Sequence, residues 1–161
     1  MNIRIGFGTD IHRLVAGRPL IIGGVRIESE LGADGHSDAD VLMHAAADAV
    51  LGSLALGDLG THFPNDEERW RNAESVQFLA YAVGLVKARG YEISNFDSTV
   101  DLETPKLRPH IDNMRANLAP ALGVDIDRVS VKAKTGERVD AVGESRAVRA
   151  EAVVLIIKTL E

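Results

Sequence analysis

The sequence predicts an α+β fold, a two-layer sandwich in which a mixed β-sheet packs against α-helices. Segments near both ends of the chain alternate apolar and polar residues as strands do, and we expect them to form antiparallel hairpins. Helical periodicity is concentrated in the interior, so the pattern differs from the strict alternation of a doubly wound parallel sheet. No repeat, linker or low-complexity run interrupts the chain, so we expect residues 1–161 to form a single domain.

The first predicted strands cover residues 2–14 and 18–27, and the turn-forming sequence VAGRP joins them. A helix is then expected over about residues 38–55, ending near Gly57. Ser37 is its expected N-cap, because Asp40 follows three residues later in a variant of the capping box. The apolar residues of this helix recur at helical spacing, at Leu42, Ala45, Ala46, Ala49 and Leu54.

The second half of the chain completes the element order ββααβαββ. Residues 57–66 contain Gly, Pro and Asn where turns need them and are expected to form a loop. Helices are predicted over residues 73–89, ended by Gly90, and 109–123, ended by Gly123. Strands are predicted over residues 91–103, 128–135 and 147–160, with a polar loop over 136–145.

The composition is that of a soluble protein and excludes several functions. The chain has no cysteine, so a bound metal must use nitrogen and oxygen ligands. A net charge of −6 and an aromatic content of 4% argue against a nucleic-acid binder. No basic segment with an apolar run opens the sequence, and no apolar stretch approaches the ~20 residues of a membrane span, so we expect a cytoplasmic protein.

Three residues suggest a metal site. Asp10 and His12 are two positions apart in a predicted strand, which places them on one face with Cα atoms ~6.6 Å apart. His44 lies on the predicted helix between Asp40 and Asp48, and one of these carboxylates is expected to accept its second ring N–H. Three such ligands suit Zn²⁺ and leave a fourth position open. By spacing alone, the favoured interpretation is a chance D-x-H pair and a surface or hydrogen-bonded histidine, and the shared metal site is the alternative.

The motifs around these residues carry a family resemblance. GFGTDIHR, IIGGVRI, HSDADVLMHAAADAVLG, LGDLGTHFP, PKLRPHIDNM and VSVKAKTGE follow one another in this order. Together they resemble the 2-C-methyl-D-erythritol 2,4-cyclodiphosphate synthase family nearly end to end. The resemblance implies a lyase of the non-mevalonate isoprenoid pathway. In that reaction the 2-phosphate of 4-diphosphocytidyl-2-C-methyl-D-erythritol 2-phosphate attacks the β-phosphorus, and CMP leaves.

The resemblance also implies the cofactors, the assembly and the site. It implies a homotrimer with active sites between subunits, one Zn²⁺ per subunit, and Mg²⁺ or Mn²⁺ on the substrate diphosphate. Two cations would offset the repulsion between phosphates, which is roughly 4 kcal/mol per pair of unit charges 4 Å apart at an effective dielectric of 20. The implied metal ligands are Asp10, His12, His44 and, for the second ion, Glu137. The implied catalytic residues are His36 and Thr135.

The implied substrate-binding residues fall into two groups along the chain. Those expected to bind the 2-phosphate and the methylerythritol portion are His36, Ser37, Asp58, Leu59, Gly60, Phe63, Pro64, Asn65, Asp66 and Glu67. Those expected at the cytidine and its phosphates are Leu102, Lys106, Leu107, Arg108, Ala133, Lys134, Thr135 and Glu137. His62 is expected at the surface, and His110 is expected to be structural.

The loop after Thr135 departs from the family pattern. Ala141 replaces an aromatic residue, and the usual G-R-x-E has become Gly143-Glu144-Ser145-Arg146, with the two charges exchanged. An ion pair would survive this exchange, but an anionic ligand bound by the usual arginine would not. Thr9 also replaces an aromatic residue found in some members, so the sequence leaves open whether an isoprenoid diphosphate binds in the trimer cavity, with Arg146 as the candidate replacement for the usual arginine.

Two alternatives to the synthase remain. A metal-dependent phosphohydrolase would use the same zinc with water in the fourth position, but no obvious general base lies beside the predicted ligands. A non-catalytic trimeric module that binds phosphates or isoprenoids would need no second-metal ligand such as Glu137. Analysis of the product separates the three functions.

Overall fold

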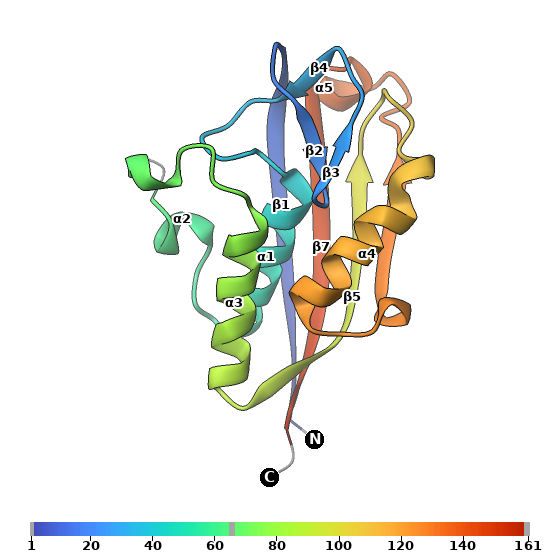
Figure 1. The fold of residues 1–161 in the computed structure, drawn as a ribbon. Coiled ribbons are helices and arrows are strands. Elements are labelled where there is room, and N and C mark those ends of the chain that lie inside the picture. The colour runs from blue at the N-terminus through green and yellow to red at the C-terminus, as the bar shows by residue number, and fades with distance from the viewer. Residues whose placement is uncertain (1, 65–66, 160–161) are drawn as a thin grey trace.

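A five-stranded mixed sheet forms one layer of the protein (Figure 1). The computed structural model describes residues 2–64 and 67–159. The strand order is β4-β1-β7-β5-β6, in which β5 and β6 are parallel and the other neighbours antiparallel. The strands are β1 (Ile3–Ala16), β4 (Leu31–Ala33), β5 (Tyr91–Asp101), β6 (Val129–Lys134) and β7 (Ala147–Lys158).

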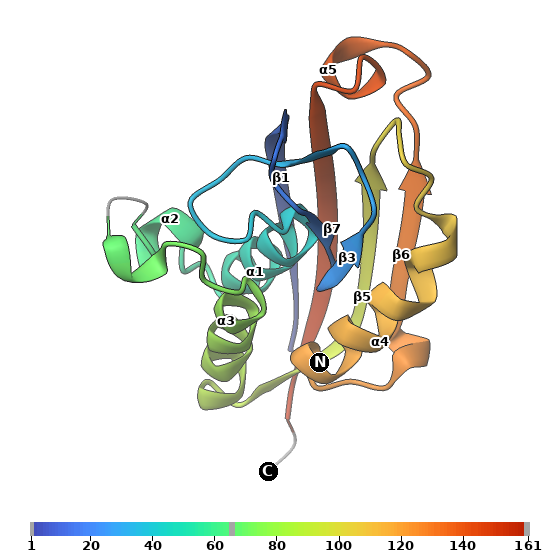
Figure 2. The same ribbon diagram turned by 45° about the horizontal axis from the view of Figure 1, so that its top comes forward.

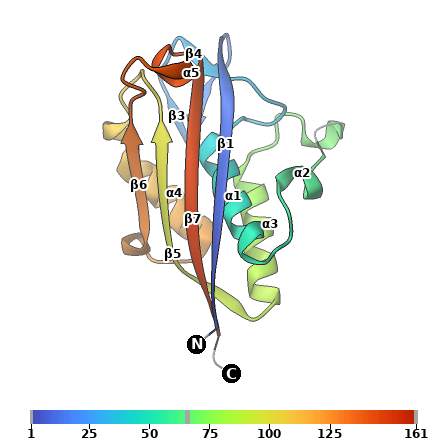
Figure 3. The ribbon, with the colours of Figure 1, turned by 180° about the vertical axis from the view of Figure 1, so that it is seen from behind.

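Helices form the second layer and cover one face of the sheet, as the view from behind shows (Figure 3). They are α1 (Val41–Ser53), α3 (Val76–Ala88) and α4 (Ile111–Leu122). The two-layer α+β architecture with a mixed sheet is therefore confirmed. Among residues 2–64 and 67–159, none of the helices has the length and apolar character needed to span a bilayer.

The opposite face of the sheet is left open by the helices. Alternate residues of β7 are buried under the helices, whereas Val153 between them is 42% exposed. The outward side of β1 carries a row of large apolar side chains, of which Ile5 is 66%, Phe7 59% and Ile11 56% exposed. Because side chains alternate along a strand, the inward side of β1 holds a different set, including Asp10 and His12.

Shorter elements lie at the edges of the two layers (Figure 2). A small hairpin of β2 (Leu20–Ile22) and β3 (Val25–Ile27) packs beside α1 and α4. The remaining elements are α2 (Leu59–His62), α5 (Asp140–Gly143), and 3₁₀ turns at Glu68–Trp70, Arg108–His110 and Ile126–Arg128.

Glycine on β1 lets α1 lie directly against the strand. A Cβ atom added to Gly6 would stand 1.8 Å from the carbonyl oxygen of Ala49, and one added to Gly8 would stand 2.1 Å from that of Ala45. Only hydrogen side chains fit at these positions while the helix stays where it is. The close approach brings His44, the neighbour of Ala45, within reach of the strand.

The structure corrects several boundaries. Asp40, not Ser37, is the N-cap of α1, and its carboxylate accepts hydrogen bonds from the backbone N–H groups of Leu42 and Met43. The segment 18–27 is a hairpin of two strands, because Gly23 and Gly24 turn the chain. The predicted loops 57–66 and 136–145 contain α2 and α5, and β4 was not predicted. The predicted end of α4 is correct, since Gly123 adopts the left-handed conformation there.

Candidate active site

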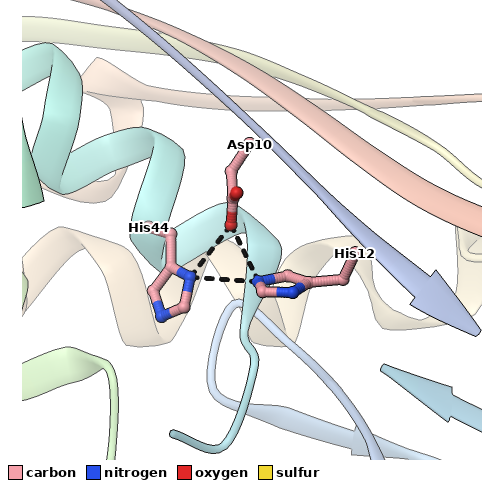
Figure 4. Close-up of side chains that lie close together, drawn as sticks. All are labelled: Asp10, His12 and His44. Carbon is pink, nitrogen blue, oxygen red and sulfur yellow. Dashed lines mark hydrogen bonds and ion pairs between the residues drawn. The ribbon is translucent and has the colours of Figure 1, made fainter. Parts of the chain in front are cut away.

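Asp10, His12 and His44 converge on one point (Figure 4). Asp10 Oδ2 lies 2.9 Å from both His12 Nε2 and His44 Nδ1, and the two nitrogens are 3.2 Å apart. The first two residues come from the inward side of β1 and the third from the first turn of α1. The three residues expected to share a metal are therefore brought together by the fold.

The proton arrangement at His12 favours a cation at this point. His12 Nδ1 lies 2.9 Å from the carbonyl oxygen of Asp34, which can only accept a hydrogen bond. The Nδ1 atom therefore carries the proton in the neutral ring, and Nε2 turns its lone pair toward Asp10. A carboxylate and a nitrogen lone pair at 2.9 Å need a positive charge between them, either a metal ion or an added proton.

The pKa shifts of His12 and Asp10 also favour a positive charge between the two side chains. Burial lowers the pKa of His12, but the hydrogen bond and the charge of Asp10 outweigh it, and the net shift is upward. Burial likewise raises the pKa of Asp10, but the hydrogen bonds and charges of His12 and His44 hold it well below its usual range. In a tetrahedral zinc site with ligands at ~2.0–2.2 Å, ligand atoms stand ~3.3–3.6 Å apart, so these residues fit such an ion after an expansion of a few tenths of an ångström.

The outer ring nitrogen of His44 has a partner that was not predicted. His44 Nε2 lies 2.8 Å from Ser75 Oγ and 3.2 Å from Ser37 Oγ. The expectation that Asp40 or Asp48 accepts this N–H is wrong. Asp40 is turned away to the helix start and the β2–β3 hairpin, and Asp48 accepts the backbone N–H of Leu59 at 2.7 Å.

A pocket of about 350 Å³ opens next to the three ligands. It gathers most of the residues predicted for the first substrate group. The pocket is lined by Asp10, His12, Gly35, His36, Ser37, His44, Asp48, Asp58, Leu59, Gly60, Phe63, Trp70 and Phe78. Among the predicted residues, Pro64 and Glu67 do not line it, and Asn65 and Asp66 lie outside the described residues.

Backbone contacts hold the segment that carries His36 and Ser37. The guanidinium of Arg18 donates to the carbonyl oxygens of Ala33, Gly35 and Ser37 at 3.0–3.2 Å. His36 Nε2 lies 3.2 Å from the carbonyl oxygen of Glu67, in the segment that leads to the pocket residue Trp70. The two segments that border the pocket are thus connected through His36.

Asp48 and Asp58 position the turn at α2. Asp58 is the N-cap of α2 and accepts hydrogen bonds from Thr61 N–H and Oγ1–H. Asp48 reaches this turn from α1 through the Leu59 N–H. Burial raises the pKa of Asp48, although the same hydrogen bond from Leu59 opposes the shift.

An aromatic wall closes one side of the pocket; Phe63 was predicted there, but Trp70 and Phe78 were missed in the sequence. The Phe63 ring meets Trp70 edge-to-face at 5.0 Å and lies tilted against Phe78 at 4.6 Å, measured between ring centroids. His62 belongs to the edge of this wall rather than to the free surface. Its ring lies 5.5 Å from Tyr81, and its Nε2 is 3.0 Å from the carbonyl oxygen of Leu56. The available signal was the chain's single tryptophan beside a predicted loop.

The second group of predicted residues forms a separate, smaller pocket. It measures about 110 Å³ and lies at the β5–β6 side of the sheet, whereas the first pocket lies at the β1 side. Its lining residues are Leu102, Lys106, Leu107, Arg108, Ala133, Lys134 and Thr135. Glu137 lies next to this pocket, where it accepts a hydrogen bond from Thr135 Oγ1 at 2.7 Å. The two pockets share no lining residue.

The altered loop keeps an ion pair. Arg146 Nη2 lies 2.6 Å from Glu144 Oε2, so the exchanged charges pair as expected, on an exposed surface. Asp140 stabilises the short helix α5 by accepting the Val142 N–H at 2.7 Å. His110 ends the 3₁₀ turn before α4, where its backbone N–H donates to the carbonyl oxygen of Leu107.

The family assignment follows from comparison with known proteins. The model of the YgbB family matches residues 3–157. The chain belongs to the YgbB family. Within it, a 2-C-methyl-D-erythritol 2,4-cyclodiphosphate synthase of Salinibacter ruber is 54% identical over 96% of this chain and 98% of its own length.

Two further relatives show how the YgbB fold occurs elsewhere. A bifunctional IspD/IspF enzyme of Albidiferax ferrireducens is 54% identical over 98% of this chain, which spans only 38% of that longer protein. A solved structure of Plasmodium falciparum IspF, a CDP complex, superposes with a TM-score of 0.87 at 34% identity and covers 99% of this chain and 98% of that one. The YgbB fold seen here thus occurs both as a separate protein and within a longer chain.

Proposed function

We propose that this protein converts 4-diphosphocytidyl-2-C-methyl-D-erythritol 2-phosphate to 2-C-methyl-D-erythritol 2,4-cyclodiphosphate with release of CMP. Relatives that this chain matches over their full length are named 2-C-methyl-D-erythritol 2,4-cyclodiphosphate synthase, and this enzyme is accordingly a phosphorus–oxygen lyase of isoprenoid biosynthesis. The observation that carries the proposal is the convergence of Asp10, His12 and His44 in the lining of the first pocket. Zn²⁺ is the proposed ion, and it would supply a Lewis acid that draws a phosphate oxygen into the pocket.

The residues of the first pocket would bind and orient the 2-phosphate and the sugar-like portion. Ser37 Oγ and the ring of His36 border the pocket and can donate hydrogen bonds to phosphate oxygens. The exposed carboxylate of Asp58 can accept hydrogen bonds from substrate hydroxyls, and the apolar wall of Phe63 suits the methyl group. Holding the attacking phosphate in place converts the reaction into a positioned intramolecular step.

The residues of the second pocket would bind the nucleotide. Lys106 is exposed and provides a positive charge for a phosphate, while Leu102 and Leu107 offer buried apolar surface. The neutral hydroxyl of Thr135 can donate to the developing oxyanion once it leaves Glu137, the proposed ligand of Mg²⁺ or Mn²⁺. One or two carboxylates with several waters are the usual setting for Mg²⁺.

The separation of the two pockets supports a homotrimer with active sites between subunits. One chain carries the metal ligands near β1 and the nucleotide residues near β5 and β6, on different sides of the sheet. A substrate that needs both groups can bind where the β1 side of one subunit contacts the β6 side of the next. Such a contact is heterologous, and repeated contacts of this kind can close into a ring. We also propose that residues 1–161 act as one domain, in the cytoplasm.

The test is to incubate the purified protein with the nucleotide substrate, with and without Mg²⁺, and to identify the products. Formation of CMP and the cyclic diphosphate without incorporation of solvent oxygen supports the synthase. An acyclic product that carries solvent oxygen identifies a hydrolase and refutes the proposal. His44→Ala is expected to lose both zinc and cyclisation, and a full complement of zinc in that variant would show that the ligand is wrongly assigned.

A further inference from the structure

We propose that Ser75 and Asp38 are positioning residues that fix the ring tautomer of His44. The pair keeps the proton on His44 Nε2 and presents the Nδ1 lone pair to the point where Asp10 and His12 meet. The inference rests on the proposed function in one respect, since it takes that point to be a metal site. It assigns a task to two side chains that do not line the substrate pockets.

The contacts form a short chain of hydrogen bonds behind His44. Ser75 Oγ lies 2.8 Å from His44 Nε2 and is also hydrogen-bonded to Asp38 Oδ1. The backbone N–H of Ser75 donates to the other oxygen of the same carboxylate at 3.1 Å. Ser75 is completely buried, so water does not compete for its hydroxyl.

Counting protons along this chain leaves one arrangement. An ionised carboxylate has no proton to give, so Ser75 must donate its single hydroxyl proton to Asp38. The same oxygen then has only lone pairs left, and it accepts from His44 Nε2–H. A neutral imidazole carries one proton, which means that Nδ1 is free to act as a ligand. Asp38 thereby decides the tautomer of a ring that it does not touch.

The position of Ser75 in the chain points to the same task. Ser75 is the N-cap residue of α3, a place where a serine hydroxyl normally accepts a backbone N–H of the first turn. Within the described part of the chain its side chain makes no such bond, and it is turned toward His44 and Asp38 instead. The hydroxyl of Ser75 therefore bonds to His44 and Asp38, and, among the described residues, the first turn of α3 lacks the hydrogen bond that an N-cap side chain usually accepts.

The order of the three groups distinguishes them from a hydrolytic triad. In a Ser-His-Asp triad the histidine stands between the other two and removes the proton of the serine. Here Ser75 stands in the middle, donates toward Asp38, and has no access to solvent. Ser37 Oγ is a second, longer partner of His44 Nε2 at 3.2 Å and already accepts the backbone N–H of Ala39. Loss of Ser75 alone should thus be partly compensated.

Asp38→Asn is the sharper of two variants. The Asp38 carboxylate accepts from three donors, the N–H and O–H of Ser75 and the N–H of Asp40, whereas an asparagine has one acceptor oxygen. If the amide nitrogen faces the hydroxyl, Ser75 is left to donate to His44 Nε2, and the ring proton moves to Nδ1. Ser75→Ala is the second variant, and Ser53→Ala is its matched control. Ser53 is an equally buried serine, on α1 like His44, but it bonds the carbonyl oxygen of Val50.

The experiment measures the zinc affinity of the metal-free proteins by competition with a chelator, without substrate. Loss of such outer partners commonly weakens metal binding by about 10–100-fold, and we expect this range for Asp38→Asn and a smaller loss for Ser75→Ala. Ser53→Ala should bind zinc as the wild type does. Nitrogen-15 spectra of the metal-free protein should show a proton on His44 Nε2 in the wild type, whether or not Asp10 also holds one at Nδ1, and its loss from Nε2 in Asp38→Asn when the amide nitrogen faces Ser75.

Two results would overturn the inference. One is zinc affinity equal to the wild type in both Asp38→Asn and Ser75→Ala, and the other is a His44 Nε2 atom that carries no proton in the metal-free wild type. Should Asp38→Asn fail to fold, Ser75→Ala against Ser53→Ala decides the question. A wild-type protein that fails to form CMP while these affinity differences persist would refute the proposed reaction and support the positioning role.

Discussion

The metal site should depend on a glycine that touches no ligand. Substituting Gly8→Ala places a methyl group between β1 and α1, where the Cβ atom would stand 2.1 Å from the carbonyl oxygen of Ala45 and 2.5 Å from the backbone nitrogen of Ala49. Both contacts are with backbone atoms, so no rotation of a side chain relieves them. The helix itself has to move.

The size of that movement can be compared with what a metal site tolerates. Raising the Cβ–oxygen distance from 2.1 Å to at least 3.0 Å requires a shift of about 0.9 Å. Metal–ligand distances vary by only about 0.2 Å around their preferred values. Because His44 precedes Ala45, the shift carries a ligand with it. We expect a loss of about 1–3 kcal/mol in the free energy of unfolding, as for other overpacked sites, and a much weaker zinc site.

Denaturant unfolding with and without zinc separates the two effects. At a zinc concentration 100 times its dissociation constant, the wild type gains about 2.7 kcal/mol, and a variant with 100-fold weaker affinity gains about 0.4 kcal/mol. Gly84→Ala is the control, because an added Cβ on this helical glycine of α3 meets no atom within 4 Å. It should be as stable as the wild type or more so. A full zinc-dependent gain in Gly8→Ala would refute the reasoning.

Three further predictions address the pockets and the charge of the metal site. Lys106→Ala should weaken CMP binding, measured by titration calorimetry, and leave the zinc content unchanged, because Lys106 lies in the pocket away from the metal ligands; unaltered CMP affinity would contradict this placement. Mixing subunits of His44→Ala with subunits of Lys106→Ala should restore about a quarter of wild-type activity if the two variants mix randomly in the proposed trimer, since one interface in four combines two intact halves. No recovery would place both halves in one subunit. Burial lowers the pKa of His12, but Asp10 outweighs burial and raises the pKa above 6.5. Protonation of His12 therefore stabilises the metal-free protein fully below pH 6.5, and this stability is lost as the pH rises through the folded pKa. Zinc competes with that proton, so zinc affinity should rise over the same pH range, and parallel pH slopes of stability for metal-free and zinc-loaded protein would argue against a shared site.

The long periodic elements were predictable because many residues report on each of them. The predicted helix 73–89 corresponds to α3 at Val76–Ala88, and the predicted strand 147–160 contains β7 at Ala147–Lys158. Short elements lack this redundancy. β4 has three residues and pairs only with the end of β1 among the described strands, so its existence depends on a tertiary contact and not on a pattern.

The metal ligands were predictable from local geometry and from the resemblance, but their surroundings were not. Alternation along β1 places Asp10 and His12 on one face, whatever the rest of the fold does. Asp40 looked like a partner of His44 because both lie on one helical stripe. The carboxylate of Asp40 is instead used by backbone N–H groups of Gly23 and Gly24, which sequence spacing does not bring close.

The partner of His44 shows the same limit. Ser75 is separated from His44 by 31 residues and stands before a helix, where a serine is usually read as a cap. The residues around Ser75 in the sequence do not indicate that its hydroxyl points toward His44. The contact becomes visible only when the backbone pairing of residues 36–38 with 72–73 is known, through the bonds from Asn72 N–H to His36 and from Asp38 N–H to Ala73.

A single strand gives the protein two chemically opposite surfaces. On one side, β1 supplies Asp10 and His12, and on the other it displays Ile5, Phe7 and Ile11 to the surroundings. If copies of the chain contact one another through this apolar row, the contact also constrains the β1 backbone that carries the two metal ligands. Substitution of apolar residues on the uncovered face would then change the rate of catalysis, although none of these residues faces the substrate.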